Sequence, residues 1–177
     1  MRQVIALIAV FVILAVGNGN KLYIPKNVIL SEPTPVEKFM DKIAQIETNG
    51  DGYHIVNKYG MMGRYQFSPA AVNAVGIRVT RQQFLQNKEL QDTAMVRLMV
   101  LNERELLPLI QRYDGKIVKG VRINRASILA GAHFAGAGGV KAFLTNDSYT
   151  GTVDGFGTSL RTYMTYFRDF HLPPLRG

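Results

Sequence analysis

One stretch of the sequence, residues 34–67, constrains the fold more than any other part of this chain. It opens with Thr34-Pro35-Val36-Glu37, where an N-cap threonine, a proline at the first helical position and a glutamate three residues after the cap form a helix-start signature. Apolar residues then recur at the helical spacing i, i+3, i+4 and i+7: Val36, Phe39, Met40 and Ile43. The pattern predicts an amphipathic helix that buries one face.

Glu47 lies near the end of this predicted helix and on its apolar side. At about 100° per residue, its position on the helical wheel falls roughly 20° from those of Val36 and Met40. A carboxyl group placed there loses hydration, which favours the protonated form that can donate a proton to a glycosidic oxygen. The alternative is that Glu47, close to Asn49-Gly50, turns into solvent as the helix ends.

The motifs around Glu47 resemble those of a known family. Glu47-Thr48-Asn49-Gly50, followed by the segment from Gly60 to Gln66 (GMMGRYQ), resembles the Glu-Ser/Thr-x-Gly and Gly-x-x-Gly-x-x-Gln signatures of soluble lytic transglycosylases and goose-type lysozymes. Residues 132–140 (AHFAGAGGV) are similar to that family's Ala-Tyr-Asn-Ala-Gly-x-Gly-x-Val segment, and the motifs follow the family's order. Residues 155–163 resemble the end of the lysozyme-like domains in some bacteriophage tail and virion proteins.

The resemblance spans roughly residues 36–170 and implies a mainly α, lysozyme-like helical domain that cleaves bacterial peptidoglycan. Glu47 would be the general acid and base that breaks the β-1,4 linkage between N-acetylmuramic acid and N-acetylglucosamine. Seven further residues are interpreted as substrate-binding: Thr48, Tyr59, Met62, Gln66, His133, Phe134 and Tyr163. No cofactor is expected, and no metal ion either, because the three histidines are not spaced as metal ligands.

Some of these assignments have structural alternatives. Gln66 could hydrogen-bond the backbone of its own loop, and His133 could be a hydrogen-bonded core histidine. Tyr59 and the pair Met61-Met62 resemble the family's groove-wall residues, but they could simply pack beneath a loop. The chain also departs from the family at His133-Phe134, where the family usually has Tyr-Asn, so a side-chain amide that often contacts the substrate is missing.

The reaction type depends on whether a second carboxylate is present. Two-carboxylate glycosidases hold these groups about 5 Å apart for retention and further apart for inversion. The candidates here are Asp51, four residues after Glu47, and Asp154, in the loop before the last helix. The resemblance implies a route without a second carboxylate, in which the muramic 6-hydroxyl attacks its own anomeric carbon, whereas goose-type relatives deliver water. We therefore expect a lytic transglycosylase, with a hydrolytic muramidase or a non-catalytic wall-binding module as alternatives.

The middle of the chain predicts two further helices. A short one is expected from Ser68 to Val75, where Gly76 ends it, and a long central one from about Asn87 to Leu107. Pro108 should kink or end the long helix. Strand is limited to at most a small hairpin, placed between Gly50 and Tyr65.

The last third of the chain predicts two more helices. Asn124 can cap a very apolar one, which the glycine-rich turn at residues 136–139 should interrupt before residues 140–144 continue as helix. The final helix should begin at Thr158 and present a buried stripe of Leu160, Tyr163, Met164 and Phe167.

An uncharged apolar stretch precedes the predicted domain. Residues 4–16 have the length of a signal-peptide core, and Ala15-Val16-Gly17 offers small residues for cleavage, although a retained anchor fits equally well. We expect residues 1–20 to be a signal peptide or membrane anchor, residues 21–35 a proline-containing tether, and residues 36–172 the catalytic domain. Such a protein would be exported or membrane-anchored and act in the periplasm or at the cell wall, and the resemblance also implies carriage in a phage particle.

Composition narrows the class of partner. The 177 residues carry a formal net charge of +8 and no cysteine, which excludes disulfides, thiol catalysis and cysteine metal sites. The positive charge favours nucleic acid, anionic lipid or the bacterial wall as partner. Lys and Arg are scattered along the sequence, without the pattern typical of nucleic-acid binding, so nucleic acid is not expected. The expected partners are peptidoglycan glycan strands, with a membrane contacted through residues 4–16.

Overall fold

The computed structural model describes residues 32–149, 151, 153 and 157–175. These residues are mainly helical, with one small two-stranded sheet, which confirms the expected fold class at that level. The predicted signal peptide or anchor, the tether up to residue 31 and Asp154 lie outside the described residues. Among the described helices, none combines the length and the apolar character needed to cross a bilayer.

Helix α1 (Pro35–Thr48) has the predicted capping box at its start. The Thr34 hydroxyl accepts a hydrogen bond from the Glu37 amide, and the Glu37 carboxylate accepts one from the Thr34 amide at 2.7 Å. At the other end, Asn49 adopts a left-handed conformation with φ of 57°, which ends the helix. The predicted apolar face is confirmed, because Phe39, Met40, Ile43 and Ala44 are buried.

Two short helices follow the loop after α1. Helix α2 (Pro69–Ala74) begins after the cap residue Ser68 and confirms the short helix expected there. Helix α3 (Arg81–Gln86) was not predicted from the sequence, although Thr80 and Gln83 form a capping box at its start. A six-residue helix is too short to show a periodic apolar pattern, so the cap is the signal that could have found it.

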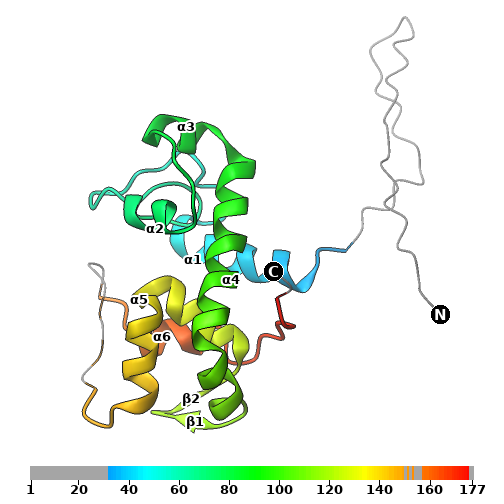
Figure 1. The fold of residues 1–177 in the computed structure, drawn as a ribbon, viewed down its shortest axis with the longest axis vertical. Helices are drawn as coiled ribbons and strands as arrows, with labels where there is room; N and C mark the ends of the chain where they lie inside the picture. The colour runs from blue at the N-terminus through cyan, green and yellow to red at the C-terminus, as the bar shows by residue number, and fades with distance from the viewer. Residues whose placement is uncertain (1–31, 150, 152, 154–156, 176–177) are drawn as a thin grey trace, which may run out of the picture. The chain divides into compact units, whose positions relative to one another are not determined.

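Helix α4 (Lys88–Tyr113) runs the length of the described unit, with α2 and α3 towards its start and α5, α6 and the small sheet towards its end (Figure 1). Of the two outcomes expected at Pro108, a kink or an end of the helix, the end is wrong, because the helix continues to Tyr113. Pro108 and Arg104 are both exposed, so water can hydrogen-bond the Arg104 carbonyl that the proline leaves without an amide partner. Leu106 and Ile110 stay buried and keep both halves of the helix on the core.

Helices α5 (Arg125–Thr145) and α6 (Leu160–Thr165) pack against each other at the far end of α4. Asn124 caps α5 as predicted, and Gly136, with φ of 71° and ψ of 165°, breaks the helix where the glycine-rich turn was expected. Helix α6 begins at Leu160 after the cap residue Ser159, slightly later than the predicted start at Thr158. Its buried stripe is confirmed, since Leu160, Tyr163, Met164 and Phe167 are each at most 1% exposed.

The small sheet is an antiparallel hairpin of β1 (Ile117–Val118) and β2 (Val121–Arg122). The turn residues Lys119 and Gly120 both have left-handed backbone, with φ of 49° and 79°, the geometry of a tight hairpin turn. The hairpin is therefore not between Gly50 and Tyr65, where it was expected. That segment makes only isolated bridges among the described residues, because left-handed turns at its glycines coil the chain too tightly for a ladder.

Candidate active site

Glu47 lies in the last turn of α1 with its carboxylate held against the core. Its Oε1 accepts a hydrogen bond from the Tyr163 hydroxyl at 2.8 Å, and its side chain is only 22% exposed. Tyr163, from α6, is 1% exposed and packs between the rings of Phe134 and Phe167, with centroid distances of 4.8 and 6.0 Å. A rigid phenol therefore fixes the carboxylate, which does not turn into solvent as the helix ends.

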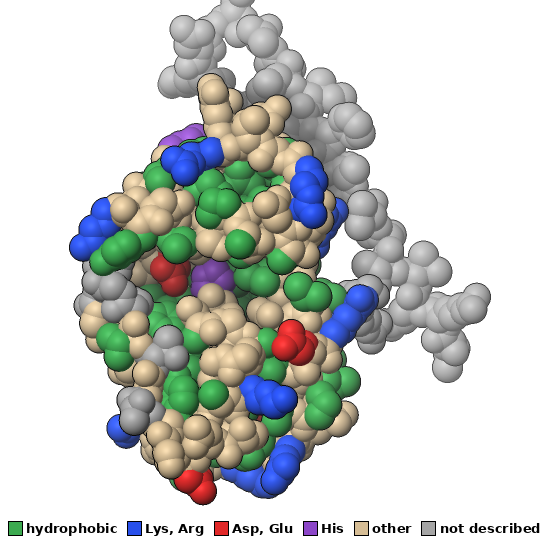
Figure 2. Space-filling view, turned by 60° about the vertical axis from the view of Figure 1, so that its left-hand side comes forward, with side chains coloured by type: hydrophobic (Ala, Val, Ile, Leu, Met, Phe, Trp, Pro, Cys, Tyr) green, Lys and Arg blue, Asp and Glu red, His purple; other side chains and the backbone are tan. Residues whose placement is uncertain are grey.

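The carboxylate borders a cavity of about 460 Å³. Figure 2 shows an acidic and a histidine side chain together in a hollow on one face of the molecule, among hydrophobic side chains. Five of the residues predicted to form the site meet in this cavity, although they come from three parts of the chain: Glu47, Tyr59, Gln66, His133 and Phe134. Met61, which was expected at the groove wall together with Met62, also borders the cavity. The remaining lining residues were not predicted: Asn57, Phe67, Ser68, Ala71 and Leu98.

Three predicted substrate-binding residues do not line the cavity. Thr48 donates its hydroxyl hydrogen to the carbonyl oxygens of Ala44 and Arg64, at 3.2 and 3.0 Å, and so ties the end of α1 to the following loop. Met62 is 3% exposed and belongs to the core, whereas its neighbour Met61 borders the cavity. Tyr163 acts on the site through its hydrogen bond to Glu47.

The candidates for a second carboxylate are not part of the described cavity wall. Asp51 is exposed, and its Oδ1 lies 3.9 Å from the Lys88 Nζ. Asp154 lies outside the described residues. Among the described residues that line the cavity, Glu47 is the one carboxylate.

Gln66 occupies a strained position at the cavity edge. Its backbone is left-handed, with φ of 52°, a conformation that costs a non-glycine residue on the order of 1 kcal/mol. Its Nε2 donates a hydrogen bond to the Gly63 carbonyl at 2.8 Å, so the amide nitrogen holds the loop as the structural alternative anticipated. The same side chain borders the cavity, and such strained residues cluster at functional sites.

His133 lies beside Glu47 in the cavity wall. Its side chain is 7% exposed, and its Nε2 lies 3.8 Å from the Glu47 Oε1. Burial lowers the pKa of His133 below its usual value of 6.5, although the Glu47 carboxylate and the Tyr65 backbone act in the opposite direction. At neutral pH the imidazole is therefore uncharged and adds no positive charge beside the acid.

This burial of His133 predicts a loss of stability in mild acid. The unfolded chain takes up a proton on His133 near pH 6.5, whereas the folded chain does so only at lower pH, so the free energy of unfolding falls as the pH drops below about 6.5. One such group contributes a slope of at most about 1.4 kcal/mol per pH unit. Urea unfolding measured at pH 5 to 8 gives the free energy of unfolding at each pH. This free energy should depend less steeply on pH in His133→Phe than in the unsubstituted protein, and His171→Phe, at an exposed site, serves as the control. Equal slopes in all three proteins would contradict the assignment.

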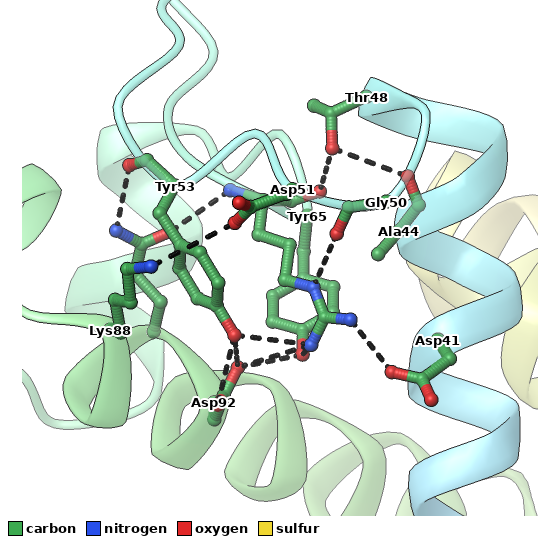
Figure 3. A network of polar contacts seen from close by, with 11 residues as sticks. Asp41, Ala44, Thr48, Gly50, Asp51, Tyr53, Tyr65, Lys88 and Asp92 are labelled. Atoms are coloured by element: carbon green, nitrogen blue, oxygen red, sulfur yellow. Dashed lines mark hydrogen bonds and ion pairs between the residues drawn. The ribbon is translucent and has the colours of Figure 1, made fainter. Parts of the chain in front are cut away.

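A polar network centred on Arg64 supports the loop that carries Gln66 (Figure 3). The Arg64 guanidinium donates to the Gly50 carbonyl at 2.8 Å and to the Asp41 carboxylate at 2.7 Å. It also donates to the hydroxyls of Tyr53 and Tyr65, at 3.1 and 3.0 Å. Arg64 therefore connects α1, the segment after α1 and the site loop.

The network continues into α4 through Asp92 and Gln91. The Asp92 carboxylate accepts the Tyr65 hydroxyl at 2.7 Å, and this bond together with burial raises the pKa of Tyr65. The Gln91 Oε1 accepts a hydrogen bond from the Arg64 backbone amide at 2.9 Å. The same atom leaves no room for a larger residue at position 63, because a Cβ added to Gly63 would lie 2.0 Å from it. The position of Gly63 in the motif thus follows from backbone shape and from the space that Gln91 fills.

The described residues hold no cluster of three or more His, Asp or Glu side chains that could bind a metal ion. Comparisons of the chain with protein-family models, with curated proteins and with solved structures found no match.

Proposed function

We propose that this chain cleaves the β-1,4 linkage between N-acetylmuramic acid and N-acetylglucosamine in peptidoglycan, with Glu47 as general acid and then base, on a lysozyme-like helical domain. The observation that carries the proposal is the Glu47 carboxylate, which a buried tyrosine fixes at the wall of a cavity of about 460 Å³. The distinctive residues of the first family signature, Glu47 and Gln66, meet in that cavity.

The chemistry of the cavity wall suits an amino-sugar chain. Tyr59, Met61 and Phe134 offer apolar surface for the faces of sugar rings, and Tyr59 is 50% exposed, so the cavity is accessible from outside. Asn57, Gln66 and Ser68 supply polar groups for hydroxyl and N-acetyl substituents. Export through residues 4–16 would bring the domain to its substrate at the wall.

The arrangement favours intramolecular ring closure over hydrolysis. Glu47 donates its proton to the linkage oxygen as the bond from that oxygen to the anomeric carbon breaks. The resulting carboxylate then accepts the proton of the muramic 6-hydroxyl as its oxygen bonds the anomeric carbon, which restores the acid and yields a 1,6-anhydro product. This cycle requires one carboxylate, and Glu47 is the one that lines the described cavity wall.

Tyr163→Phe tests the positioning of the acid. The substitution removes one hydroxyl and retains the ring that packs on Phe134 and Phe167, so the melting temperature should change little. Loss of a hydrogen bond to a charged group, worth about 1.5 kcal/mol or more, should slow cleavage about tenfold or more. The rate is measured as release of soluble fragments from purified sacculi.

Tyr166→Phe is the matched control for this experiment, because Tyr166 is the C-cap residue of α6 and is 51% exposed. It should keep the rate of the unsubstituted protein. If Tyr163→Phe releases fragments as fast as Tyr166→Phe, the Tyr163 hydroxyl does not position the acid.

A further inference from the structure

The hairpin of β1 and β2 presents an exposed apolar side chain at one end of the described unit. Ile117 is 75% exposed, the largest exposure among the large hydrophobic residues that the structure describes. It pairs with Arg122 across the hairpin, so these two side chains share the outer face. Val118 and Val121 form the inner face, where Val121 is fully buried and Val118 packs against the core.

Cationic side chains surround this hairpin. Arg112 and Lys116 lie over the ring of Tyr113, 5.5 and 5.7 Å from its centroid. Lys119 donates to the Phe143 carbonyl at 2.9 Å, and Arg161 of α6 lies against the turn, so that a Cβ on Gly120 would be 2.8 Å from its Nη2. The stems of these side chains cover apolar surface while their charged ends reach the molecular surface.

The charge at this end of the molecule is mostly unbalanced. Residues 112–122 contain four cations and one acidic residue, Asp114, and Arg161 adds a fifth cation from α6. None of the five cations forms an ion pair with a carboxylate that the structure describes. The lower end in Figure 2, where Figure 1 places the hairpin, shows Lys and Arg side chains near hydrophobic ones, with an acidic side chain at its lowest point.

We propose that this hairpin end docks on an anionic lipid surface, with Ile117 entering the boundary between headgroups and acyl chains. The five cations would contact lipid phosphates around it. An apolar side chain at the tip of a basic patch favours lipid over nucleic acid as the partner. A bilayer offers both phosphates for the cations and an apolar region for the 75% exposed Ile117, whereas a nucleic-acid backbone offers the phosphates alone. The hairpin is separate from the cavity that contains Glu47, so this proposal does not depend on the proposed function.

A single tryptophan provides the test, because the chain contains none. In full-length Ile117→Trp, the indole emission should shift to shorter wavelength with vesicles that contain phosphatidylglycerol and stay unchanged with pure phosphatidylcholine vesicles. The anionic-vesicle shift should weaken as salt is added. Because the one tryptophan of this variant stands at position 117, a bilayer contact made through residues 4–16 alone does not shift its emission, and a shift reports entry of the hairpin into the lipid.

Two controls separate docking at the hairpin from general binding. Val96→Trp places the reporter on α4 at a site that is 41% exposed, about 24 Å along the helix from Arg112, and should show no shift. Adding Lys116→Glu and Arg122→Glu to Ile117→Trp should abolish the shift, whereas adding Lys38→Glu and Lys42→Glu, at exposed positions of α1, should retain it. Circular dichroism checks that each variant is folded.

Three results would overturn the proposal. One is the absence of a shift with anionic vesicles, and another is an equal shift with neutral vesicles. The third is a response to soluble poly-glutamate without any response to anionic vesicles, which would identify an acidic polymer as the partner.

Discussion

Glu47→Gln is expected to lose the release of soluble fragments from purified sacculi, by at least about a hundredfold, while the protein stays folded. Glutamine has the size of glutamate, and its side-chain oxygen can still accept the hydrogen bond that Tyr163 donates to the Glu47 Oε1. It cannot donate a proton to a glycosidic oxygen as a carboxylic acid does. Binding to sacculi should persist, because the rest of the cavity wall is unchanged.

Asp51→Asn is the matched control for this substitution. It also converts a carboxylate to its amide, but at an exposed residue that does not line the cavity. The control should cleave as fast as the unsubstituted protein, and both variants should melt within a few degrees of it. A Glu47→Gln protein that cleaves at the rate of the control would refute the assignment of Glu47 as acid.

Arg64→Met should cause a larger loss of stability than either Glu47→Gln or Tyr163→Phe. The guanidinium donates to two phenols, a carboxylate and a backbone carbonyl, and it is 16% exposed. Methionine fills part of the space but leaves those acceptors short of donors, which should cost about 3 kcal/mol. For a chain of this size the melting temperature should fall by about 10 °C.

Differential scanning calorimetry measures this change, with Arg81→Met as control because Arg81 is an exposed residue at the start of α3. Arg64→Met should also cleave sacculi more slowly at temperatures where it is folded, since the loop that carries Gln66 loses its support. A melting temperature equal to that of Arg81→Met would show that the network does not hold the loop.

Local signals in the sequence predicted the helices well. The caps at Thr34, Ser68, Asn87 and Asn124 place helix starts to within a residue, because each side chain satisfies a backbone amide that has no partner inside the helix. The break at Gly136 was predicted from another local signal, the run of glycines, because glycine readily adopts the positive φ found there.

Features that depend on tertiary packing were not predicted correctly. Proline is compatible with α4 because Arg104 and Pro108 are exposed residues, and their exposure depends on which side of the helix the neighbouring elements cover. The hairpin at residues 117–122 turns at Lys119-Gly120, and Lys-Gly indicates a tight turn less strongly in a sequence than Asn-Gly does. Its two-residue strands are too short to show alternation.

The candidate site was predicted in part. Motif spacing identified Glu47 and Gln66, and the family resemblance placed Tyr163 among the site residues. The hydrogen bond between Glu47 and Tyr163, across 116 residues, depends on the packing of α6 and could not be read from periodicity. The network of Arg64, Tyr65, Gln91 and Asp92 was missed, because no local pattern connects the Gly63-Arg64 turn with α4. Which methionine borders the cavity, Met61 or Met62, depends on the bridge of Met62 with Phe67 that directs Met62 inward.

Mass spectrometry of the soluble products from purified sacculi distinguishes ring closure by Glu47 from hydrolysis. Ring closure yields muropeptides ending in 1,6-anhydro-muramic acid, each lighter by one water than a hydrolytic product, and Glu47→Gln should release none. Reducing muramic ends would show that water is the nucleophile and would refute the transglycosylase mechanism while keeping the acid. Sacculi that stay intact with the folded, unsubstituted protein would contradict the proposed cleavage itself.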